Sequence, residues 1–294
     1  MLQRNPSDEK TEKNAVERGT LYLVATPIGN MADISSRALK ILSTVDFVAA
    51  EDTRNSGLML SRLNIQKPMV SYHEHNRRER GPYIAERLKN GEACALVTDA
   101  GTPAVSDPGE DLVRLCAEEG IPVTAVPGCC AAVNALALSG LSTRRFAFEG
   151  FLPVSGRERE ERLKELKSET RTVILYEAPH RLRETLSDLF AALGDRHAAL
   201  CREMTKLNEE ILRTTLSGAV KIYEEKEPRG EYVLVIEGVT REEEQADYPE
   251  DIAAHVALLE DGGLSRMDAI KAAARARGVK KNDIYNALIR QDEE

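Results

Sequence analysis

Short apolar runs alternate with amphipathic helical patterns from residue 19 onward, and this alternation limits the possible folds more than any other feature. Short runs that are bounded by turn residues are typical of strands buried on both faces of a sheet. Strands separated by helices pair in parallel, because the chain must cross back over the sheet before the next strand begins. The pattern therefore predicts a parallel sheet with strands at Thr20–Thr26, Val45–Ala50, Pro68–Tyr72, Ala93–Thr98 and Ile121–Val126.

A second group of apolar runs begins after Leu141. The last two of these runs flank one short helical pattern instead of a long crossover, which indicates a mixed sheet. We therefore predict two α/β domains, residues 19–141 with a parallel sheet and residues 142–240 with a mixed sheet. The strands expected in the second sheet are Phe146–Phe151, Thr172–Tyr176, His197–Arg202, Glu210–Leu216 and Glu231–Ile236.

Three further segments lie outside these two domains. Residues 1–18 alternate in charge and lack an apolar stretch, so we expect a disordered lead without a signal peptide. The stretch Arg241–Asp251 carries six acids and one Arg, which predicts an acidic, solvated linker at residues 241–249. Three short helical patterns in residues 250–294 predict a small, all-helical appendage that resembles a helix-turn-helix unit.

Composition excludes several classes of function. The chain carries 40 Lys and Arg against 49 Asp and Glu, so its net charge of −9 disfavours binding of nucleic acid through overall charge. No apolar run reaches the roughly 20 residues of a membrane span. Five cysteines without a C-x-x-C pair fit a reducing cytoplasm and offer no zinc site. We therefore expect a cytoplasmic protein with no metal site and no membrane segment.

The segment Thr98–Gly109 is the strongest indication of a ligand site. It follows an apolar strand and precedes a helix, which is where ligands bind in open α/β sheets. Small residues such as Gly101 leave the backbone open to close approach. Asp107 is expected to cap the following helix, with Glu110 at the helix's positive end. A tight structural turn without a ligand is the alternative interpretation.

Two more turns of small residues are predicted at the same edge of the sheet. Thr26–Asn30 follows the first strand and Pro127–Val133 follows the fifth. Close packing of a helix on the sheet explains the second turn equally well. Neither turn has the G-x-G-x-x-G pattern, and the chain has no Walker A pattern. The absence of both patterns disfavours nicotinamide chemistry, phosphoryl transfer and the common Rossmann methyltransferase.

Four clusters of polar residues also follow predicted strands, namely Glu51–Arg54, His73–Arg78, Tyr176–Arg181 and Arg202–Lys206. Solvated loop charge explains any one of them, but four clusters at strand ends indicate a shared cleft. Their arginines suit a substrate that carries phosphate, because guanidinium groups bind phosphate through charge-assisted hydrogen bonds.

Six of these segments occur together and in one order: Gly19–Asn30, Ala50–Arg54, Asp99–Gly109, Val126–Gly128, Tyr176–Arg181 and Arg202–Lys206. In this combination the chain closely resembles the ribosomal RNA cytidine 2′-O-methyltransferases of the tetrapyrrole methylase superfamily. The resemblance covers about residues 19–240, and the C-terminal helices resemble that family's helix-turn-helix appendage.

The resemblance implies a two-domain tetrapyrrole-methylase-like fold, with S-adenosylmethionine folded into the cleft between the domains. It also implies a homodimer that acts on 16S rRNA in the small ribosomal subunit. Tetrapyrrole methylases carry a Gly-Asp-Pro cofactor loop where this chain has Gly101-Thr102-Pro103, so Thr102 replaces the Asp and the resemblance implies a role for the loop backbone alone. By the same matching, the cofactor site is expected to include Pro27, Asp99, Gly101, Thr102, Pro103, Ala104, Val105, Gly128, Cys130, Ala131, Tyr176, Glu177, Leu207 and Glu231.

The implied reaction needs alignment of an activated methyl group with a ribose 2′-hydroxyl, and a group that accepts a proton. It needs no metal. The candidates for acid–base or electrostatic roles are Asp52, Glu177, Glu203 and Lys206. The residues expected to clamp RNA phosphates are Arg54, Arg77 and Arg78.

The C-terminal helices carry a local positive charge. Between Gly262 and Arg290 there are seven cations and two acids, so 7 − 2 gives a net charge of +5. Lys271 and Arg275 are four residues apart and therefore share one side of a helix, where we expect them to bind RNA. Ala269, Ile270, Ala273 and Ala274 are expected to pack inward. A solubilising or dimer-packing tail is the alternative.

Two rival functions stay open on the sequence alone. The first is a methylase that acts on a carbon of a porphyrinoid. Glu51–Arg54 and the basic C-terminal helices count against it, because a porphyrin site needs neither. The second is a non-catalytic RNA-binding or assembly factor, which would not bind S-adenosylmethionine.

Overall fold

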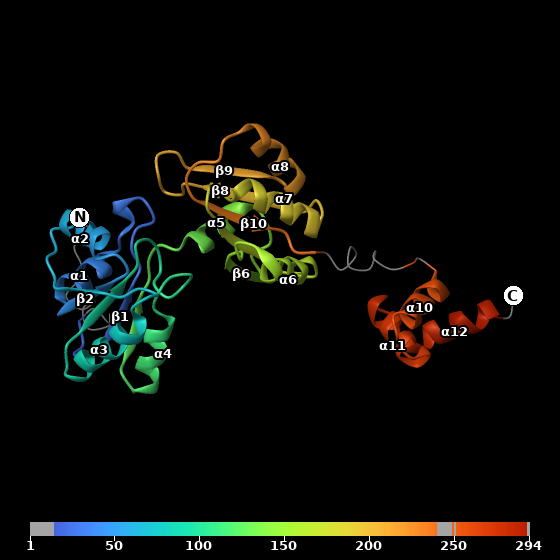
Figure 1. Ribbon diagram of the computed structural model, residues 1–294, viewed down its shortest axis with the longest axis horizontal. Helices are drawn as coiled ribbons and strands as arrows, with labels where there is room; N and C mark the ends of the chain where they lie inside the picture. The colour runs from blue at the N-terminus through green and yellow to red at the C-terminus, as the bar shows by residue number, and fades with distance from the viewer. Residues whose placement is uncertain (1–14, 240–248, 250, 293–294) are drawn as a thin grey trace, which may run out of the picture.

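The computed structural model describes residues 15–239, 249 and 251–292, which form two α/β domains and a group of three helices (Figure 1). All ten strands expected from the apolar runs are present. Among the described residues, no helix is both long enough and apolar enough to cross a membrane.

The first domain contains a parallel sheet in the order β3-β2-β4-β1-β5. Side chains alternate between the faces of a strand, and both faces are apolar here, so helices cover both sides. Tyr22 and Val24 of β1 pack with α1 and α2, whereas Leu21 packs with α3 and α4. The elements are β1 (Leu21–Val24), the 3₁₀ turn η2 (Met31–Asp33), α1 (Ser36–Thr44), β2 (Phe47–Ala50), α2 (Thr53–Arg62), β3 (Met69–Ser71), α3 (Arg77–Lys89), β4 (Cys94–Val97), α4 (Glu110–Glu118) and β5 (Val123–Val126).

The second domain contains a mixed sheet in the order β6-β7-β10-β8-β9. Strands β6 and β7 are parallel and the other neighbours are antiparallel, so the sheet is mixed, as expected. The last two strands, β9 and β10, are not neighbours but lie on either side of β8, so the antiparallel pairs do not come from the short connection between them. The elements are β6 (Phe146–Phe151), α6 (Gly156–Lys167), β7 (Thr172–Glu177), α7 (Leu182–Leu193), β8 (His197–Arg202), β9 (Glu210–Thr215), α8 (Leu216–Glu225) and β10 (Tyr232–Ile236).

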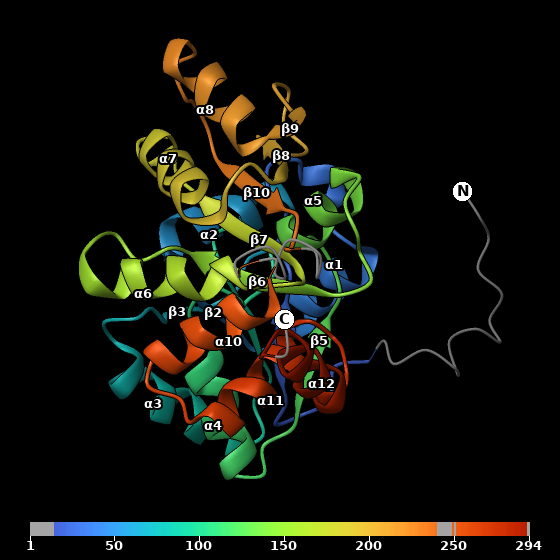
Figure 2. The same ribbon diagram turned by 90° about the vertical axis from the view of Figure 1, so that its right-hand side faces the viewer.

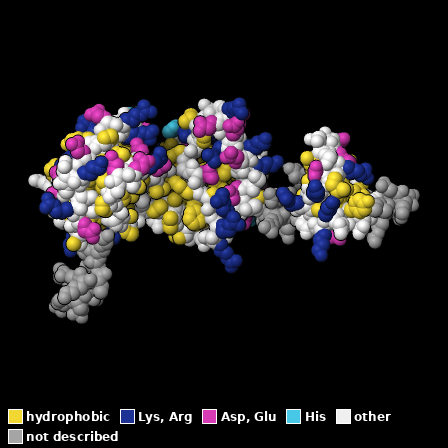
Figure 3. All heavy atoms as spheres, turned by 90° about the horizontal axis from the view of Figure 1, so that it is seen from below, with side chains coloured by type: hydrophobic (Ala, Val, Ile, Leu, Met, Phe, Trp, Pro, Cys, Tyr) yellow, Lys and Arg dark blue, Asp and Glu magenta, His cyan; other side chains and the backbone are white. Residues whose placement is uncertain are grey.

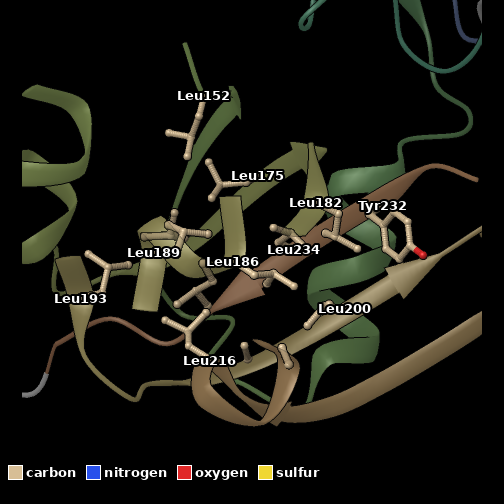
Figure 4. Packing of buried hydrophobic residues seen from close by; sticks show 14 of the residues in the cluster. Leu152, Leu175, Leu182, Leu186, Leu189, Leu193, Leu200, Leu216, Tyr232 and Leu234 are labelled. Atoms are coloured by element: carbon tan, nitrogen blue, oxygen red, sulfur yellow. The ribbon is translucent and has the colours of Figure 1, made fainter. Parts of the chain in front are cut away.

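The core of the second domain lies on both faces of this sheet. Leu175, Leu200 and Leu234 point toward α6, α7 and α8 and form the cluster drawn in Figure 4. On the other face, Ile174 and Val235 pack against α5 (Ala131–Ser139). Figure 2 shows α5 on the opposite side of the sheet from α6 and α7. Helix α5 therefore packs on the second sheet, although it precedes the expected domain boundary at residue 141.

The C-terminal group consists of α10 (Ile252–Asp261), α11 (Arg266–Ala276) and α12 (Lys281–Asp292). Its small core combines Val256 of α10 and Ile284 and Leu288 of α12 with the four residues of α11 that were expected to face inward, Ala269, Ile270, Ala273 and Ala274. Arg277 Nη2 donates to the carbonyl of Asp251 at 3.0 Å, which joins the end of α11 to the start of α10. Figure 1 draws these helices apart from the two sheet domains.

One expected helix cap is wrong. The N-cap of α4 is Gly109, with φ of 142° and no side-chain cap, and Asp107 lies two residues before it. The backbone turns at Gly109 in a conformation that a residue with a side chain rarely adopts. The side chain of Asp107 therefore faces the cavity described below and does not cap the helix.

Candidate active site

A cavity of about 400 Å³ lies where the two sheet domains meet. This volume falls within the range of about 300–1,000 Å³ that is typical of small-molecule sites. The first domain contributes residues that follow β1, β2 and β4. The second sheet contributes β6, the ends of β7 and β8 and the start of β10, and the start of α5, which packs on that sheet, completes the wall. The lining residues are Ile28, Glu51, Thr98–Thr102, Val105–Asp107, Cys130, Ala131, Phe151, Tyr176–Ala178, Cys201, Glu203, Met204, Lys206 and Glu231–Val233.

The loop after β4 is held by backbone hydrogen bonds to the loop after β1. The amide of Thr26 donates to the carbonyl of Gly101 at 2.8 Å, and the amide of Gly101 donates back to Thr26 at 3.1 Å. Gly101 has φ of +87°, in the left-handed region that favours glycine. Thr102 Oγ1 donates to the carbonyl of Cys129 at 3.0 Å, which ties the same loop to the start of α5. The small residues therefore make a fixed wall of exposed backbone, suited to close approach of a ligand.

The N-terminus of α5 also opens into the cavity. Its N-cap, Cys130, makes no side-chain cap, and both Cys130 and Ala131 line the cavity. The amide of Ala132 donates to the hydroxyl of Tyr176 at 3.3 Å, which joins the start of α5 to β7. Burial, together with the neighbouring Cys130, raises the pKa of Tyr176 to about 12, so this hydroxyl keeps its proton. The helix N-terminus offers further amide groups and the positive end of its dipole to a ligand.

A lysine between two glutamates forms the wall from β8 and β10. Lys206 Nζ donates to Glu203 Oε1 at 2.9 Å and to Glu231 Oε2 at 3.0 Å. Burial alone would lower the pKa of Lys206, but its hydrogen bonds to Glu203 and Glu231 outweigh burial and raise that pKa. The hydrogen bond from Lys206 lowers the pKa of Glu203. Lys206 is therefore held as a cation, and Glu203 is held as an anion.

Glu177 is a buried anchor at the end of β7. Its side chain is only 1% exposed. Oε2 accepts a hydrogen bond of 2.5 Å from Thr185 Oγ1, and Oε1 accepts one of 2.8 Å from the amide of Ala178. The guanidinium of Arg159 donates to Thr185 Oγ1 at 3.1 Å and so closes a network between β7, α6 and α7. Both carboxylate oxygens thus have partners within the protein.

Three carboxylates line the cavity on the side of the first domain. Glu51 Oε2 accepts from Thr98 Oγ1 at 3.1 Å, and Asp99 Oδ2 accepts from Asn55 Nδ2 at 2.9 Å. Asp107 lies beside them. Burial, with the charges of Glu51 and Asp99, raises the pKa of Asp107 to about 6 even though Thr98 donates to it. This wall is therefore strongly acidic and contains one group that titrates near neutrality.

Three of the four candidates for acid–base or electrostatic roles lie in this cavity, namely Glu177, Glu203 and Lys206. Asp52 is not among the lining residues. It is the N-cap of α2 and accepts from the amide of Arg54 and, at 2.8 Å, from Arg54 Nη2. These hydrogen bonds, from the side chain first, lower the pKa of Asp52 to about 2. Its position at a strand end therefore has a structural explanation in helix capping.

Most residues of the expected cofactor site lie together. Nine of them line the cavity: Asp99, Gly101, Thr102, Val105, Cys130, Ala131, Tyr176, Glu177 and Glu231. Pro27, Pro103 and Ala104 lie in the adjoining loops but are not among the lining residues. Gly128 packs against Ala25, where a Cβ would approach the Ala25 side chain to 2.9 Å, so close packing explains this glycine. Leu207 is fully exposed, immediately after Lys206.

The residues expected to bind RNA lie outside the cavity. Arg54 has an 88% exposed side chain and pairs with Asp52. Arg77 pairs with Glu74 at 2.9 Å, while Arg78 is exposed near the start of α3. Because β3 is an edge strand, the cluster His73–Arg78 lies at the side of the sheet and does not reach the cavity. On α11, Lys271 and Arg275 are both exposed.

Several lining residues were not among the expected site residues. They are Ile28, Glu51, Thr98, Ala100, Ser106, Asp107, Phe151, Ala178, Cys201, Met204, Tyr232 and Val233. Glu51 and Asp107 belong to segments that the sequence already marked, so their position at strand ends was a usable signal. Phe151 and Val233 reach the cavity only because the second sheet packs beside the first domain.

Comparison with known proteins identifies the family and supports the fold. The family described as Tetrapyrrole (Corrin/Porphyrin) Methylases matches residues 20–220. The solved structure of diphthine synthase superposes with a TM-score of 0.61 at 18% identity and covers 75% of this chain and 90% of its own. At that identity, the likeness concerns the fold alone.

Two bacterial relatives are much closer in sequence, and both are named ribosomal RNA small subunit methyltransferase I. The protein from Synechocystis sp. is 45% identical over 268 residues, which cover 91% of this chain and 96% of that relative. The protein from Thermotoga maritima is 46% identical over 220 residues, which cover 75% of this chain and 99% of that relative. The second relative is therefore shorter, with no counterpart for about a quarter of this chain.

Proposed function

The chain belongs to the tetrapyrrole methylase family, and we propose that it transfers a methyl group from S-adenosylmethionine to a cytidine 2′-hydroxyl in 16S rRNA of the small ribosomal subunit. The identity of about 45% over almost the full length of a relative named ribosomal RNA small subunit methyltransferase I carries the methylation of small-subunit rRNA, and the resemblance seen in the sequence adds the cytidine 2′-hydroxyl. An RNA of the small ribosomal subunit also implies a cytoplasmic location.

The cavity fits S-adenosylmethionine in size and in chemistry. Gly101 and Thr102 present backbone, and Ile28, Val105 and Met204 present apolar surface that suits a nucleoside. Six carboxylates and one lysine line the cavity, so the formal charge is 1 − 6 = −5 when all are ionised. An acidic site favours a positively charged sulfonium over its neutral product. We assign the cofactor to this cavity on these grounds.

When bound, S-adenosylmethionine supplies a methyl group that its positive sulfur has already activated. The residues of the chain must then bind the donor, exclude water and hold the ribose hydroxyl in line with the methyl carbon. The loop Gly101–Val105 and the start of α5 are suited to hold the donor, and the Glu203–Lys206–Glu231 cluster is suited to hold polar groups beside it. Glu177 keeps the end of β7 in place through Thr185.

RNA would reach this cavity across the exposed face of the first domain. Arg54 follows β2 at the same strand edge as Glu51, and its guanidinium is almost fully exposed. Arg77 and Arg78 extend the positive charge along the start of α3. Lys271 and Arg275 on α11 offer a second set of cations for phosphate. These five residues are the proposed RNA contacts.

We also propose that the protein is a homodimer. Exposed apolar side chains occur on α5, where Val133 is 53% exposed, and on β6, where Phe146 is 44% exposed. Figure 3 shows hydrophobic side chains gathered on the second domain, which is the middle body in that view. Light scattering after size-exclusion chromatography should give a mass twice that of one chain, which is 32.5 kDa. A mass of one chain at micromolar concentration would contradict the dimer.

The decisive experiment measures methyl transfer directly. Purified protein is incubated with methyl-labelled S-adenosylmethionine and small ribosomal subunits from a strain that lacks the gene. The expected result is label in 16S rRNA at one cytidine 2′-oxygen. Untreated subunits of the deletion strain should carry no methyl group at that position. Label on a porphyrinoid in place of RNA would support the first rival function. A protein that binds no S-adenosylmethionine would support the second.

A further inference from the structure

The carboxylate of Asp107 differs in its partners from the other acids of the cavity. Glu177, Glu203 and Glu231 accept hydrogen bonds from Thr185, Lys206 or backbone amides, and Asp99 accepts one from Asn55. Asp107 and Glu51 instead share the hydroxyl of Thr98, which donates to Glu51 at 3.1 Å. A hydroxyl has one proton to donate, so it satisfies one of the two carboxylates at a time.

The charges around Asp107 also favour uptake of a proton. Glu51 faces it from the end of β2 and Asp99 from its own loop, and Tyr176 faces it from β7 of the second domain. Among the described residues, no Lys or Arg forms an ion pair with Asp107. Partial burial, and then the two neighbouring acids, disfavour its anion and raise its pKa to about 6. Such a group is mostly ionised at neutral pH, and taking up a proton removes its unfavourable charge.

The loop holds Asp107 in a conformation that needs support from both domains. Ala104 and Ser106 have φ of 67° and 60°, in the left-handed region that residues with side chains seldom occupy. Ser106 lies so close to Gly150 in β6 that a Cβ at position 150 would approach Ser106 Oγ to 2.8 Å. Strained backbone that packing holds in place is frequent at functional sites. The side chain thus projects from a fixed loop into the cavity.

From this geometry we infer that Asp107 is the residue that accepts the proton of the substrate hydroxyl during methyl transfer. The inference rests on the proposed function. The oxygen–hydrogen bond of the 2′-hydroxyl breaks, and its proton passes to a carboxylate oxygen of Asp107. The oxygen's electron pair forms the new bond to the methyl carbon, and the electron pair of the carbon–sulfur bond stays on sulfur. The products are a methyl ether, a neutral thioether and a protonated Asp107.

The test compares Asp107→Asn with Glu110→Gln in the full-length protein. Glu110 lies three residues further on, at the start of α4, and its exposed side chain pairs with Arg114, so it is a matched loss of one carboxylate. Single-turnover methyl transfer to small subunits, at saturating S-adenosylmethionine, should slow by roughly 100-fold or more in Asp107→Asn. Glu110→Gln should transfer like wild type. Calorimetry should give an unchanged affinity for S-adenosylmethionine in Glu110→Gln, and a decrease of no more than about threefold in Asp107→Asn, where one of the six carboxylates of the cavity loses its charge.

Two pH measurements separate proton acceptance from a structural role. The single-turnover rate of wild type should rise with pH as Asp107 loses its proton, with a midpoint near its pKa of about 6. In Asp107→Asn this step should vanish, and the rate should rise in proportion to hydroxide. Carboxyl carbon NMR of the free protein, with no substrate present, should show a resonance that titrates near that midpoint and is missing from the variant.

Each outcome decides one question. If wild type methylates rRNA and Asp107→Asn does so within about threefold of its rate, Asp107 accepts no proton. Loss of S-adenosylmethionine affinity in the folded variant would make Asp107 a binding residue and would also overturn the inference. A wild-type protein that methylates no rRNA would instead overturn the proposed function.

Discussion

At the scale of single residues, similar side chains have different roles because their partners differ. Asp52 and Asp107 both follow strands of the first sheet, yet hydrogen bonds from Arg54 lower the pKa of one to about 2, and burial raises the pKa of the other to about 6. Two glycines are also required for different reasons. Gly101 has a left-handed backbone conformation that favours glycine, and Gly128 packs so closely against Ala25 that a side chain would clash. Three predictions follow from such local surroundings.

Gly101→Val should abolish binding of S-adenosylmethionine while the protein stays folded. A branched residue at φ of +87° is strained, and its side chain would enter the space left for the ligand. Titration calorimetry measures the affinity. Gly120→Val is a matched control, since Gly120 has φ of +67° but lies in the turn after α4, away from the cavity. Unchanged affinity in folded Gly101→Val would refute the assigned site.

Arg54→Ala should weaken rRNA binding and methylation but leave the affinity for S-adenosylmethionine nearly unchanged. The guanidinium is 88% exposed and outside the cavity, and the amide that Asp52 caps belongs to the backbone and is retained. Filter binding of rRNA and calorimetry of the cofactor check the two affinities. The reverse pattern, with cofactor affinity lost and RNA affinity kept, would move Arg54 into the cofactor site.

Asp107→Asn should stabilise the free protein at pH 8 but not at pH 4. The native pKa of about 6 is higher than the ordinary value of 3.8, so the native state binds the proton more tightly than the unfolded state does. Stability is therefore lost as pH rises through this interval, and the loss is complete above it. Asparagine removes the half-buried charge and, because solvent partly screens that charge, should recover only on the order of 1–2 kcal/mol at pH 8. Thermal melts at both pH values test this, and a pH-independent difference would contradict it.

At the scale of elements, buried polar contacts join β7 to the helices that cover it. Arg159 of α6 is 5% exposed and Thr185 of α7 is 1% exposed. Arg159 donates a hydrogen bond to the hydroxyl of Thr185, and that hydroxyl donates to Glu177. Arg159 also donates to Asp188 at 2.8 Å. Since Glu177 ends β7 inside the cavity, this network ties the position of the cavity wall to the packing of two helices.

Thr185→Val should destabilise the second domain by about 2–4 kcal/mol, because it leaves the buried Arg159 and Glu177 without a shared partner. Urea denaturation measures the free energy of unfolding. Ser187→Ala on the same helix is the control, since its exposed hydroxyl bonds only to the carbonyl of Arg183 and should matter by less than about 0.5 kcal/mol. Equal stabilities of the two variants would show that the network contributes little.

At the scale of the whole molecule, the two sheet domains and the C-terminal helices are expected to bind different ligands, the cofactor and RNA. The cavity needs both sheet domains, because residues of each line it. The C-terminal helices have a core of their own and carry a positive charge that opposes the overall −9. Since these helices have their own core, we expect them to bind RNA separately from the cofactor site.

Truncation after Glu244 should weaken binding of small subunits and reduce its dependence on salt, with no change in affinity for S-adenosylmethionine. Cations that bind phosphate release counterions, so removing them flattens the plot of affinity against salt concentration. Fluorescence anisotropy at several salt concentrations gives both quantities. Lys271→Ala combined with Arg275→Ala in the full-length chain should reproduce part of the effect. An unchanged affinity and salt slope after truncation would show that these helices have another role.

The sequence alone was sufficient to predict the strands, the C-terminal helices and the two kinds of sheet. Period, length and turn residues predicted all ten strands and the three C-terminal helices, because burial on both faces makes a strand apolar and burial on one face makes a helix amphipathic. The loop of small residues after β4 was predicted as a ligand site from local features. Its conformation at Gly101 and its position at a strand end both depend on residues that are close in the sequence.

Only the tertiary structure decided which charged residues share the cavity. The sequence placed Asp52, His73–Arg78 and Glu203 on equal terms at strand ends. The order of the strands in the first sheet puts β3 at the edge, and helix capping occupies Asp52, so neither contributes to the cavity. The surroundings of Asp107 depend on β2, β4 and β7, whose residues are far apart in the chain. A pKa depends on neighbours in space, and only folding brings those neighbours together.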